Sequence, residues 1–251
     1  MQINYQYMVK KCLEFAPNGK ILDYGCGRAE IVEEGLKQDL DIVGVEAFYE
    51  GNQSKKVVKQ KGLLNSSVFP LGTNFEIPFP PDTFDLIISN QVLEHVEDID
   101  YTLKEIQRVL KSTGTFITIF PHLSVWREGH CGIPFSHWFN SRSPSRYPYM
   151  RFFRLLGFGY NKAGKTSHEW VKFYMHYLDK FTYYRKLSVI HKAFLRNNFT
   201  FKSNEINYMK YRLEARNIKL HKIIANNTLF QKLLLLLYRV LGGVTFICHK
   251  S

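Results

Sequence analysis

Two acidic residues flank a pair of glycines in the segment Asp23-Tyr-Gly25-Cys-Gly27-Arg-Ala29-Glu30. An apolar stretch precedes this segment and a stretch with helical spacing follows it, so the glycines would form a strand-to-helix turn where a ligand can approach the backbone. Glu46 follows Gly27 by 19 residues and would end the next strand, placed to accept hydrogen bonds from a ribose diol. The spacing predicts a nucleotide-binding loop, and Glu46 argues against a glycine turn without a ligand.

The charges of this loop indicate which nucleotide it binds. A pyrophosphate requires free N–H groups at the start of a helix. Here Glu30 occupies the position where dinucleotide-binding proteins keep a small residue, and Asp23 adds a second negative charge. Both carboxylates would repel phosphates, whereas both would attract the ammonium and sulfonium groups of S-adenosylmethionine. The loop therefore favours S-adenosylmethionine over a nicotinamide or flavin dinucleotide.

Five motifs in this order resemble those of the class I S-adenosylmethionine-dependent methyltransferases. They are Ile21-Leu-Asp-Tyr-Gly-Cys-Gly27, Val43-Gly-Val-Glu46, Glu76-Ile-Pro-Phe-Pro-Pro-Asp-Thr-Phe-Asp85, Asn90-Gln-Val-Leu-Glu-His95 and Leu103-x-x-Ile-x-Arg-Val-Leu-Lys111-x-x-Gly114. The similar subgroup is the one that contains the ubiquinone and menaquinone biosynthesis enzymes.

The resemblance implies an α/β, Rossmann-like fold with a seven-stranded sheet in the order 3-2-1-4-5-7-6, strand 7 antiparallel and helices on both faces. Residues 199–207 would be strand 6 and residues 244–248 strand 7. The chain 1–251 would then be a single methyltransferase domain. Residues 1–121 would bind the cofactor, residues 122–198 would form a helical substrate-binding insertion after strand 5, and residues 199–251 would supply the last two strands and a helix.

The resemblance also implies roles in cofactor binding. Asp23, Gly25 and Gly27 would line the methionine moiety, Glu46 would bind the ribose, and Ala47 and Phe48 would flank the adenine. Where relatives carry Gly-Asp-Ala, this chain has Gly-Thr-Asn, so that Thr73 or Asn74 must replace the aspartate. The predicted cofactor set is completed by Cys26, Phe75, Asn90 and Gln91. After transfer the bound product would be S-adenosylhomocysteine.

Methyl transfer is an in-line displacement in which the protein mainly supplies alignment, with a base where the acceptor carries a proton. His95 is one candidate base, and the more conservative interpretation is a histidine that merely packs or forms a structural hydrogen bond there. The second candidate group is Glu128, His130 and His137, in a segment directly after the fifth strand. We expect His130 to act as general base with Glu128 orienting it. The spacing of His122, His130, Cys131 and His137 matches no familiar zinc site, so no metal is expected.

Strands and helices must alternate to position these residues. Apolar runs predict strands at 20–24, 41–46, 67–71, 85–89 and 115–120, with helices at 28–38, 50–61 and 99–111 between them. Strand–helix alternation with apolar strands is typical of a parallel sheet covered on both faces. Residues 122–148 are expected to form a long loop, followed by helices at 149–156, 169–184 and 186–197. Residues 220–241 are read as a core helix leading into an edge strand, because the apolar run is short for a membrane span.

Composition narrows the class of protein. The 251 residues are 45% hydrophobic and 15% aromatic, which excludes a disordered chain. Four scattered cysteines, Cys12, Cys26, Cys131 and Cys248, argue against a disulfide framework and fit a reducing compartment. The first residues lack the continuous apolar core of a secretory signal, so a cytoplasmic protein is expected.

Charge divides the chain into two unlike halves. Residues 1–121 hold 12 Lys and Arg against 17 Asp and Glu, a net charge of −5. Residues 122–251 hold 22 against 5, a net charge of +17. The basic half either is solvated or faces an anionic partner such as a nucleotide- or diphosphate-linked sugar, a lipid headgroup or a membrane surface. Nucleic acid is a weaker interpretation, because the Asn-Pro-Pro-Tyr signature of amino-methylating enzymes is absent.

These patterns predict a cytoplasmic methyltransferase that O-methylates a small molecule or a glycan- or lipid-linked intermediate. The alternatives left open are an N- or C-methyltransferase and a non-catalytic S-adenosylmethionine-binding protein. A nicotinamide dehydrogenase is disfavoured by Glu30. The acceptor and the oligomeric state stay open.

Overall fold

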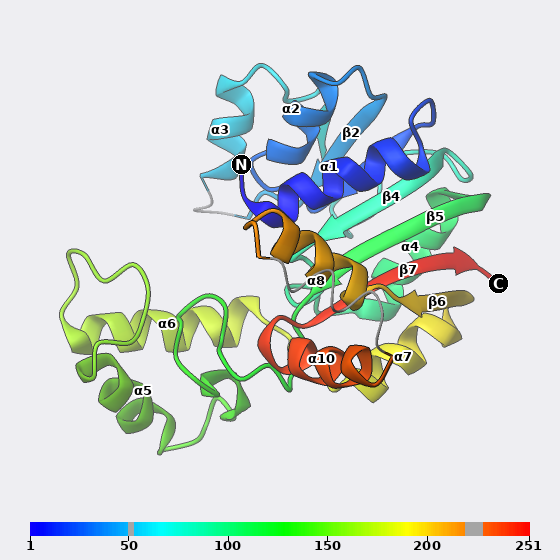
Figure 1. The fold of residues 1–251 in the computed structure, drawn as a ribbon. Coiled ribbons are helices and arrows are strands. Elements are labelled where there is room, and N and C mark those ends of the chain that lie inside the picture. Colours follow the sequence, from blue (N-terminus) through cyan, green and yellow to red (C-terminus); the bar gives the residue numbers. More distant parts are fainter. Residues whose placement is uncertain (50–52, 219–227) are drawn as a thin grey trace.

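A parallel sheet with one antiparallel strand forms the centre of the molecule. The computed structural model describes residues 1–49, 53–218 and 228–251. Within them seven strands form one sheet in the order β3-β2-β1-β4-β5-β7-β6, with β7 antiparallel to both neighbours (Figure 1). The strands are β1 (Ile21–Tyr24), β2 (Ile42–Glu46), β3 (Val68–Pro70), β4 (Phe84–Asn90), β5 (Leu110–Phe120), β6 (Phe199–Ser203) and β7 (Val244–Lys250). The predicted fold class and strand order are confirmed.

Helices cover both faces of this sheet. They are α1 (Ile3–Phe15), α2 (Glu30–Leu36), α3 (Ser54–Gln60), α4 (Ile99–Val109), α5 (Arg146–Leu155), α6 (Ser167–Phe181), α7 (Leu187–Arg196), α8 (Glu205–Glu214) and α10 (Thr228–Leu241), with a 3-10 turn at Ser136–Trp138. Alternating strand residues feed two cores, because successive side chains point to opposite faces. Leu22 and Ile87 join the core under α4 and α7, and Ile21 and Ile88 join the core under α1, α2, α3, α8 and α10.

The parallel register brings the glycine loop and the acidic residues to one edge of the sheet. Asp23 pairs with Gly44 on β2 and with Ile88 on β4. The carboxyl ends of β1, β2 and β4 therefore lie side by side, and ligands of open α/β sheets bind at this edge.

Residues after β5 form a separate group of helices before the chain returns to the sheet. α5 and α6 pack around Trp170, which is fully buried together with Cys131 and Met150, and project to one side of the sheet (Figure 1). α7 lies within the range predicted for the insertion, but its Phe194 packs in the core under α4. The helices that stand apart from the sheet are thus α5 and α6.

Two expectations for the carboxyl-terminal half are wrong. The predicted helix 220–241 starts outside the described residues, and its described part, α10, is a surface helix rather than a core helix. Leu236 and Leu241 are each 63% exposed, and Tyr238 is its buried contact with the sheet core. β7 is an internal strand, and β6 is the edge, because β7 pairs with both β5 and β6.

Two helices were not expected. The strand predicted for 199–207 ends at Ser203, and α8 begins at Glu205. α1 buries Tyr7, Met8 and Cys12 against the sheet among polar neighbours. No helix in the described part of the chain is both long enough and apolar enough to cross a membrane.

Candidate functional site

The glycine loop leaves β1 through backbone conformations that favour glycine. Gly25 has φ +76° and Gly27 has φ +57°. A Cβ on Gly25 would lie 2.4 Å from Cγ2 of Val92, because the loop after β4 packs directly on the turn. A Cβ on Gly27 would have no atom of the described residues within 4 Å, so among these residues nothing covers this part of the backbone. The loop is packed on one side and accessible on the other, as a ligand cradle requires.

Two buried carboxylates stand beside this loop. Glu46 Oε2 accepts a hydrogen bond from the Gly27 N–H at 2.7 Å, and Oε1 accepts one from the Ala47 N–H at 3.0 Å. Asp23 is 1% exposed, and its Oδ2 has no hydrogen-bond partner among the described residues. An ionised carboxylate has about four acceptor sites, so both groups retain capacity for ligand hydroxyl or ammonium donors.

Burial raises the pKa of both carboxylates, and repulsion by neighbouring acids adds to the shift of Asp23. Burial, followed by the charges of Glu46 and Glu30, raises the pKa of Asp23 to about 8. Burial also raises the pKa of Glu46, against the opposing effect of its backbone hydrogen bonds. A cationic ligand would stabilise the ionised forms of these carboxylates, whereas a pyrophosphate would destabilise them. The residues present therefore fit S-adenosylmethionine, with its ammonium, sulfonium and ribose hydroxyl groups.

The remaining residues of the predicted cofactor set lie along the same edge of the sheet. Cys26 is buried and Phe48 is half-buried. Asn90 ends β4 and accepts a hydrogen bond from Asn4 of α1 at 3.1 Å, while Gln91 is exposed beside it. Thr73, Asn74 and Phe75 occupy an exposed turn that starts next to Glu46, where the Leu71 N–H donates to the Glu46 carbonyl at 3.0 Å.

The structure brings three of the four predicted catalytic residues together. His130 Nδ1 lies 2.6 Å from Glu128 Oε1, and His130 Nε2 lies 3.1 Å from His95 Nε2. His95 comes from the loop after β4, whereas Glu128 and His130 come from the segment after β5, 35 residues further along the chain. The Glu128 carboxylate thus contacts the His130 ring directly.

Hydrogen bonds hold the Glu128 carboxylate in place. Tyr184 donates its hydroxyl to Oε1 at 2.7 Å, and the N–H groups of His130 and Cys131 donate to Oε2. Burial alone would raise the pKa of Glu128, but the hydrogen bond and charge of His130 lower it to about 2. Burial opposes the charged form of His130, yet Glu128 raises the pKa of its imidazole. His95 has a pKa lowered to about 4 by burial and by the neighbouring His130.

His137, the fourth predicted residue, lies apart from this hydrogen-bonded group. Its Nε2 lies 3.1 Å from the Leu123 carbonyl, and its ring packs on Tyr184 with 4.5 Å between ring centroids. The four residues considered for zinc also do not form a cluster of ligands among the described residues. One of them, Cys131, instead contacts Ser136 Oγ through its Sγ. The trio of potential metal ligands among the described residues is Glu94, His95 and His130.

Two residues of this site carry no signal in the sequence that predicts their role. Glu94 stands within the quoted motif that ends at His95, and its buried carboxylate became apparent only from the packing. Tyr184 is 56 residues from Glu128, and nothing in its local sequence marks it as a partner of that carboxylate.

A cavity of about 430 Å³ opens beside Gln91 at the carboxyl ends of β4 and β5. Its lining includes Ile119, Tyr208, Arg212 and Arg216. Two arginines make this cavity suitable for an anionic group.

The chain is similar to known methyltransferases, which agrees with the geometry of the glycine loop. Residues 22–118 match the family described as "Methyltransferase domain". Over 108 residues the chain is 34% identical to an uncharacterized methyltransferase of Schizosaccharomyces pombe, covering 38% of this chain and 37% of that protein. It is 31% identical over 121 residues to the ubiquinone/menaquinone biosynthesis C-methyltransferase UbiE of Geotalea daltonii, covering 45% of this chain and 50% of that protein.

Structural comparison supports the fold. The crystal structure of an S-adenosylmethionine-dependent methyltransferase from Mesorhizobium loti aligns over 100% of both chains with a TM-score of 0.57 and 14% identity. The sequence alignments span between 26% and 50% of the length of the first curated relatives. Residues 22–118 therefore match the methyltransferase domain family, and the chain resembles the class I S-adenosylmethionine-dependent methyltransferases of the ubiquinone/menaquinone biosynthesis subgroup.

Proposed function

We propose that the protein is an S-adenosylmethionine-dependent methyltransferase that O-methylates a small molecule or a glycan- or lipid-linked intermediate. The observation that carries this proposal is the buried Asp23 carboxylate beside Glu46, with an oxygen that no described residue satisfies. An unsatisfied buried carboxylate is costly, and a ligand ammonium or hydroxyl would compensate it. The match of residues 22–118 to the methyltransferase domain supports the same conclusion.

The proposed cofactor site follows from the loop geometry. Asp23, Gly25 and Gly27 would hold the methionine moiety, Glu46 the ribose hydroxyls, and Ala47 and Phe48 the adenine. S-adenosylmethionine supplies a methyl group on a positively charged sulfur. The chain supplies alignment and a site that excludes water, as methyl transfer requires.

We place the acceptor between this loop and the segment after β5. His95 and His130 face each other there, and Glu128 fixes the His130 ring. In the absence of other ligands, His130 Nε2 is the atom that would take up the proton of an acceptor hydroxyl. N- or C-methylation stays an alternative, because the same geometry would accept those acceptors.

An anionic acceptor is the substrate class that the charges favour. Arg212 and Arg216 line the cavity beside Gln91, within the half of the chain that carries the excess of basic residues. Contact with a membrane surface is supported by α10, on which Leu233, Leu236 and Leu237 are exposed. Nucleic acid stays the weaker interpretation, since none of these features is specific to it.

Titration calorimetry with S-adenosylhomocysteine and with NAD tests the cofactor proposal. We expect S-adenosylhomocysteine to bind and NAD to give no heat of binding, because Glu30 and Asp23 oppose phosphates. A matched pair of variants is Asp23→Asn, which should weaken binding, and Asp41→Asn, an exposed acid before β2, which should not. Binding of NAD with no binding of S-adenosylhomocysteine would refute the proposed cofactor.

A second experiment separates an enzyme from a binding protein. A thermal-shift screen with S-adenosylhomocysteine present would select acceptors from phosphorylated and glycosylated metabolites. Each hit would then be incubated with S-adenosylmethionine and analysed by mass spectrometry for a methylated product. Acceptors that stabilise the protein but never gain a methyl group would support the non-catalytic alternative.

A further inference from the structure

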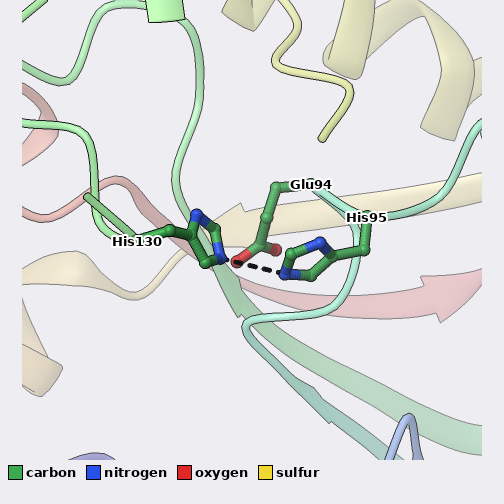
Figure 2. A group of neighbouring side chains, drawn as sticks. All are labelled: Glu94, His95 and His130. Carbon is green, nitrogen blue, oxygen red and sulfur yellow. Dashed lines mark hydrogen bonds between the residues drawn. The ribbon is translucent and has the colours of Figure 1, made fainter. Parts of the chain in front are cut away.

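Glu94, His95 and His130 bring three potential metal-ligating atoms within 4.8 Å of one another (Figure 2). The carboxylate of Glu94 is directed toward the gap between the two imidazole rings, and the dashed line in Figure 2 joins the facing nitrogens. We propose that these three residues bind one divalent transition-metal ion, which positions and activates the methyl acceptor.

The hydrogen bonds of the two rings already present the correct nitrogens. His95 Nδ1 lies 2.5 Å from the Phe181 carbonyl, which can only accept, so Nδ1 carries the hydrogen and Nε2 a lone pair. His130 Nδ1 faces the Glu128 carboxylate at 2.6 Å, so it also carries a hydrogen. Metal-bound histidines are typically held in this way, with the second nitrogen donating to a carbonyl or a carboxylate.

The separation of the nitrogens fits a shared ion. Two donors that each lie about 2.0–2.1 Å from one metal ion are about 2.9–3.4 Å apart at octahedral to tetrahedral angles. The observed distance between His95 Nε2 and His130 Nε2 is 3.1 Å. Without a proton or a cation between them, two lone pairs would face each other at this distance.

Glu94 provides an independent reason to place a cation here. It is 2% exposed, and neither of its carboxylate oxygens has a hydrogen-bond partner within the described ranges 1–49, 53–218 and 228–251. A cation at the facing nitrogens would satisfy this carboxylate, which otherwise bears the full cost of burial. Two imidazoles and one carboxylate suit Zn²⁺, Fe²⁺ or Mn²⁺ and leave coordination positions for an acceptor.

The role of the ion, unlike its binding, rests on the proposed function. The His130 side chain keeps 23% of its surface exposed, so the trio is accessible. An acceptor hydroxyl that coordinates the ion would lose its proton to solvent more readily, because the cation stabilises the oxyanion. His130 Nε2 would then be a ligand and would not itself take up the proton, so the metal replaces the general base.

The test starts with metal binding by the 251-residue chain without an affinity tag. The protein is dialysed against EDTA and then titrated with Zn²⁺, Mn²⁺ or Co²⁺, with calorimetry and metal analysis after desalting as readouts. We expect one ion per chain and visible ligand-field bands for Co²⁺. Mg²⁺, which prefers oxygen ligands, should bind more weakly.

Variants locate the ion. Glu94→Gln and His95→Ala should each weaken binding at least tenfold, and Glu128→Gln should weaken it about 10- to 100-fold through the lost orientation of His130. The matched control is His176→Ala, an exposed histidine on α6, which should still bind one ion. Thermal unfolding of each variant checks the fold, and the wild-type titration does not depend on any variant.

The outcomes separate this inference from the proposed function. Absence of binding by the wild-type chain, or binding unaffected by both Glu94→Gln and His95→Ala, would overturn the metal site. Methyl transfer that persists at full rate in metal-free protein would overturn the role of the ion and return His130 to the role of base. A bound ion without methyl transfer to any acceptor would instead count against the proposed function.

Discussion

Replacing Asp23 by asparagine tests whether this buried carboxylate receives the cationic part of the cofactor. In the ligand-free protein Asp23 has a pKa of about 8, because it is buried and lies near Glu46 and Glu30. It therefore holds a proton at neutral pH. A ligand ammonium requires the ionised carboxylate, so binding of S-adenosylhomocysteine must release this proton.

The size of the effect follows from linkage. Below the pKa of about 8, affinity should rise about tenfold for each pH unit, and above it the affinity should level off. Between pH 6.5 and pH 8.5 this amounts to an increase of about 25-fold. Asp23→Asn cannot ionise, so its affinity should be lower at pH 8.5 and nearly independent of pH.

Calorimetry at several pH values, in buffers with different ionisation enthalpies, measures both affinity and released protons. We expect nearly one proton released per ligand at pH 6.5 and few at pH 8.5 for the wild type. The Asp41→Asn control should reproduce the wild-type curve. A wild-type affinity that does not vary with pH, or a slope that survives in Asp23→Asn, would refute the reasoning.

Four further substitutions give separable outcomes. Gly25→Ala should lower both the melting temperature and the affinity for S-adenosylhomocysteine, because the new Cβ would lie 2.4 Å from Val92. Gly27→Ala should lower the melting temperature less, because its Cβ would meet no atom of the described residues. Equal melting temperatures of the two variants would contradict this. Glu46→Gln should weaken binding at least tenfold in calorimetry, since hydrogen bonds to charged groups contribute about 1.5–3 kcal/mol. Phe194→Ala should lower the free energy of unfolding in urea by about 3–5 kcal/mol and leave cofactor affinity nearly unchanged, because Phe194 is fully buried; a selective loss of binding would count against this assignment.

Local sequence was sufficient for the cofactor half of the fold. The apolar runs that became β1, β2, β4 and β5 are buried on both faces, so their pattern does not depend on distant partners. The glycines and the charges of Asp23 and Glu46 also act within one strand–turn–helix unit and the neighbouring strand. For this reason the loop and its ligand class could be predicted from residue type and spacing.

The helices around the edges were harder to predict, because their burial is decided by tertiary contacts. The leucines of α10 suggested a core helix, yet Leu236 and Leu241 lie at the surface. In α1 polar residues interrupt the apolar ones, and the sheet offers the surface that buries Met8 and Cys12. In both cases the burial of the helix depends on whether another element offers an apolar surface for it to pack against. The periodicity of the helix's own segment does not encode this.

The sequence by itself determined which chemical groups this protein has: a glycine turn flanked by carboxylates, and histidines after the fourth and fifth strands. Only the tertiary structure decided that Glu94, His95 and His130 meet. Glu94 and His95 lie in the loop after β4 and His130 lies in the segment after β5, so the packing of these two segments brings them together. The tertiary structure also decided that the Glu94 carboxylate is buried with no hydrogen-bond partner in the described part of the chain, while the Glu128 carboxylate receives several hydrogen bonds. Burial and distance are properties of the packed chain, and they turn acidic residues of the same type into a positioning group in one case and a proposed metal ligand in the other.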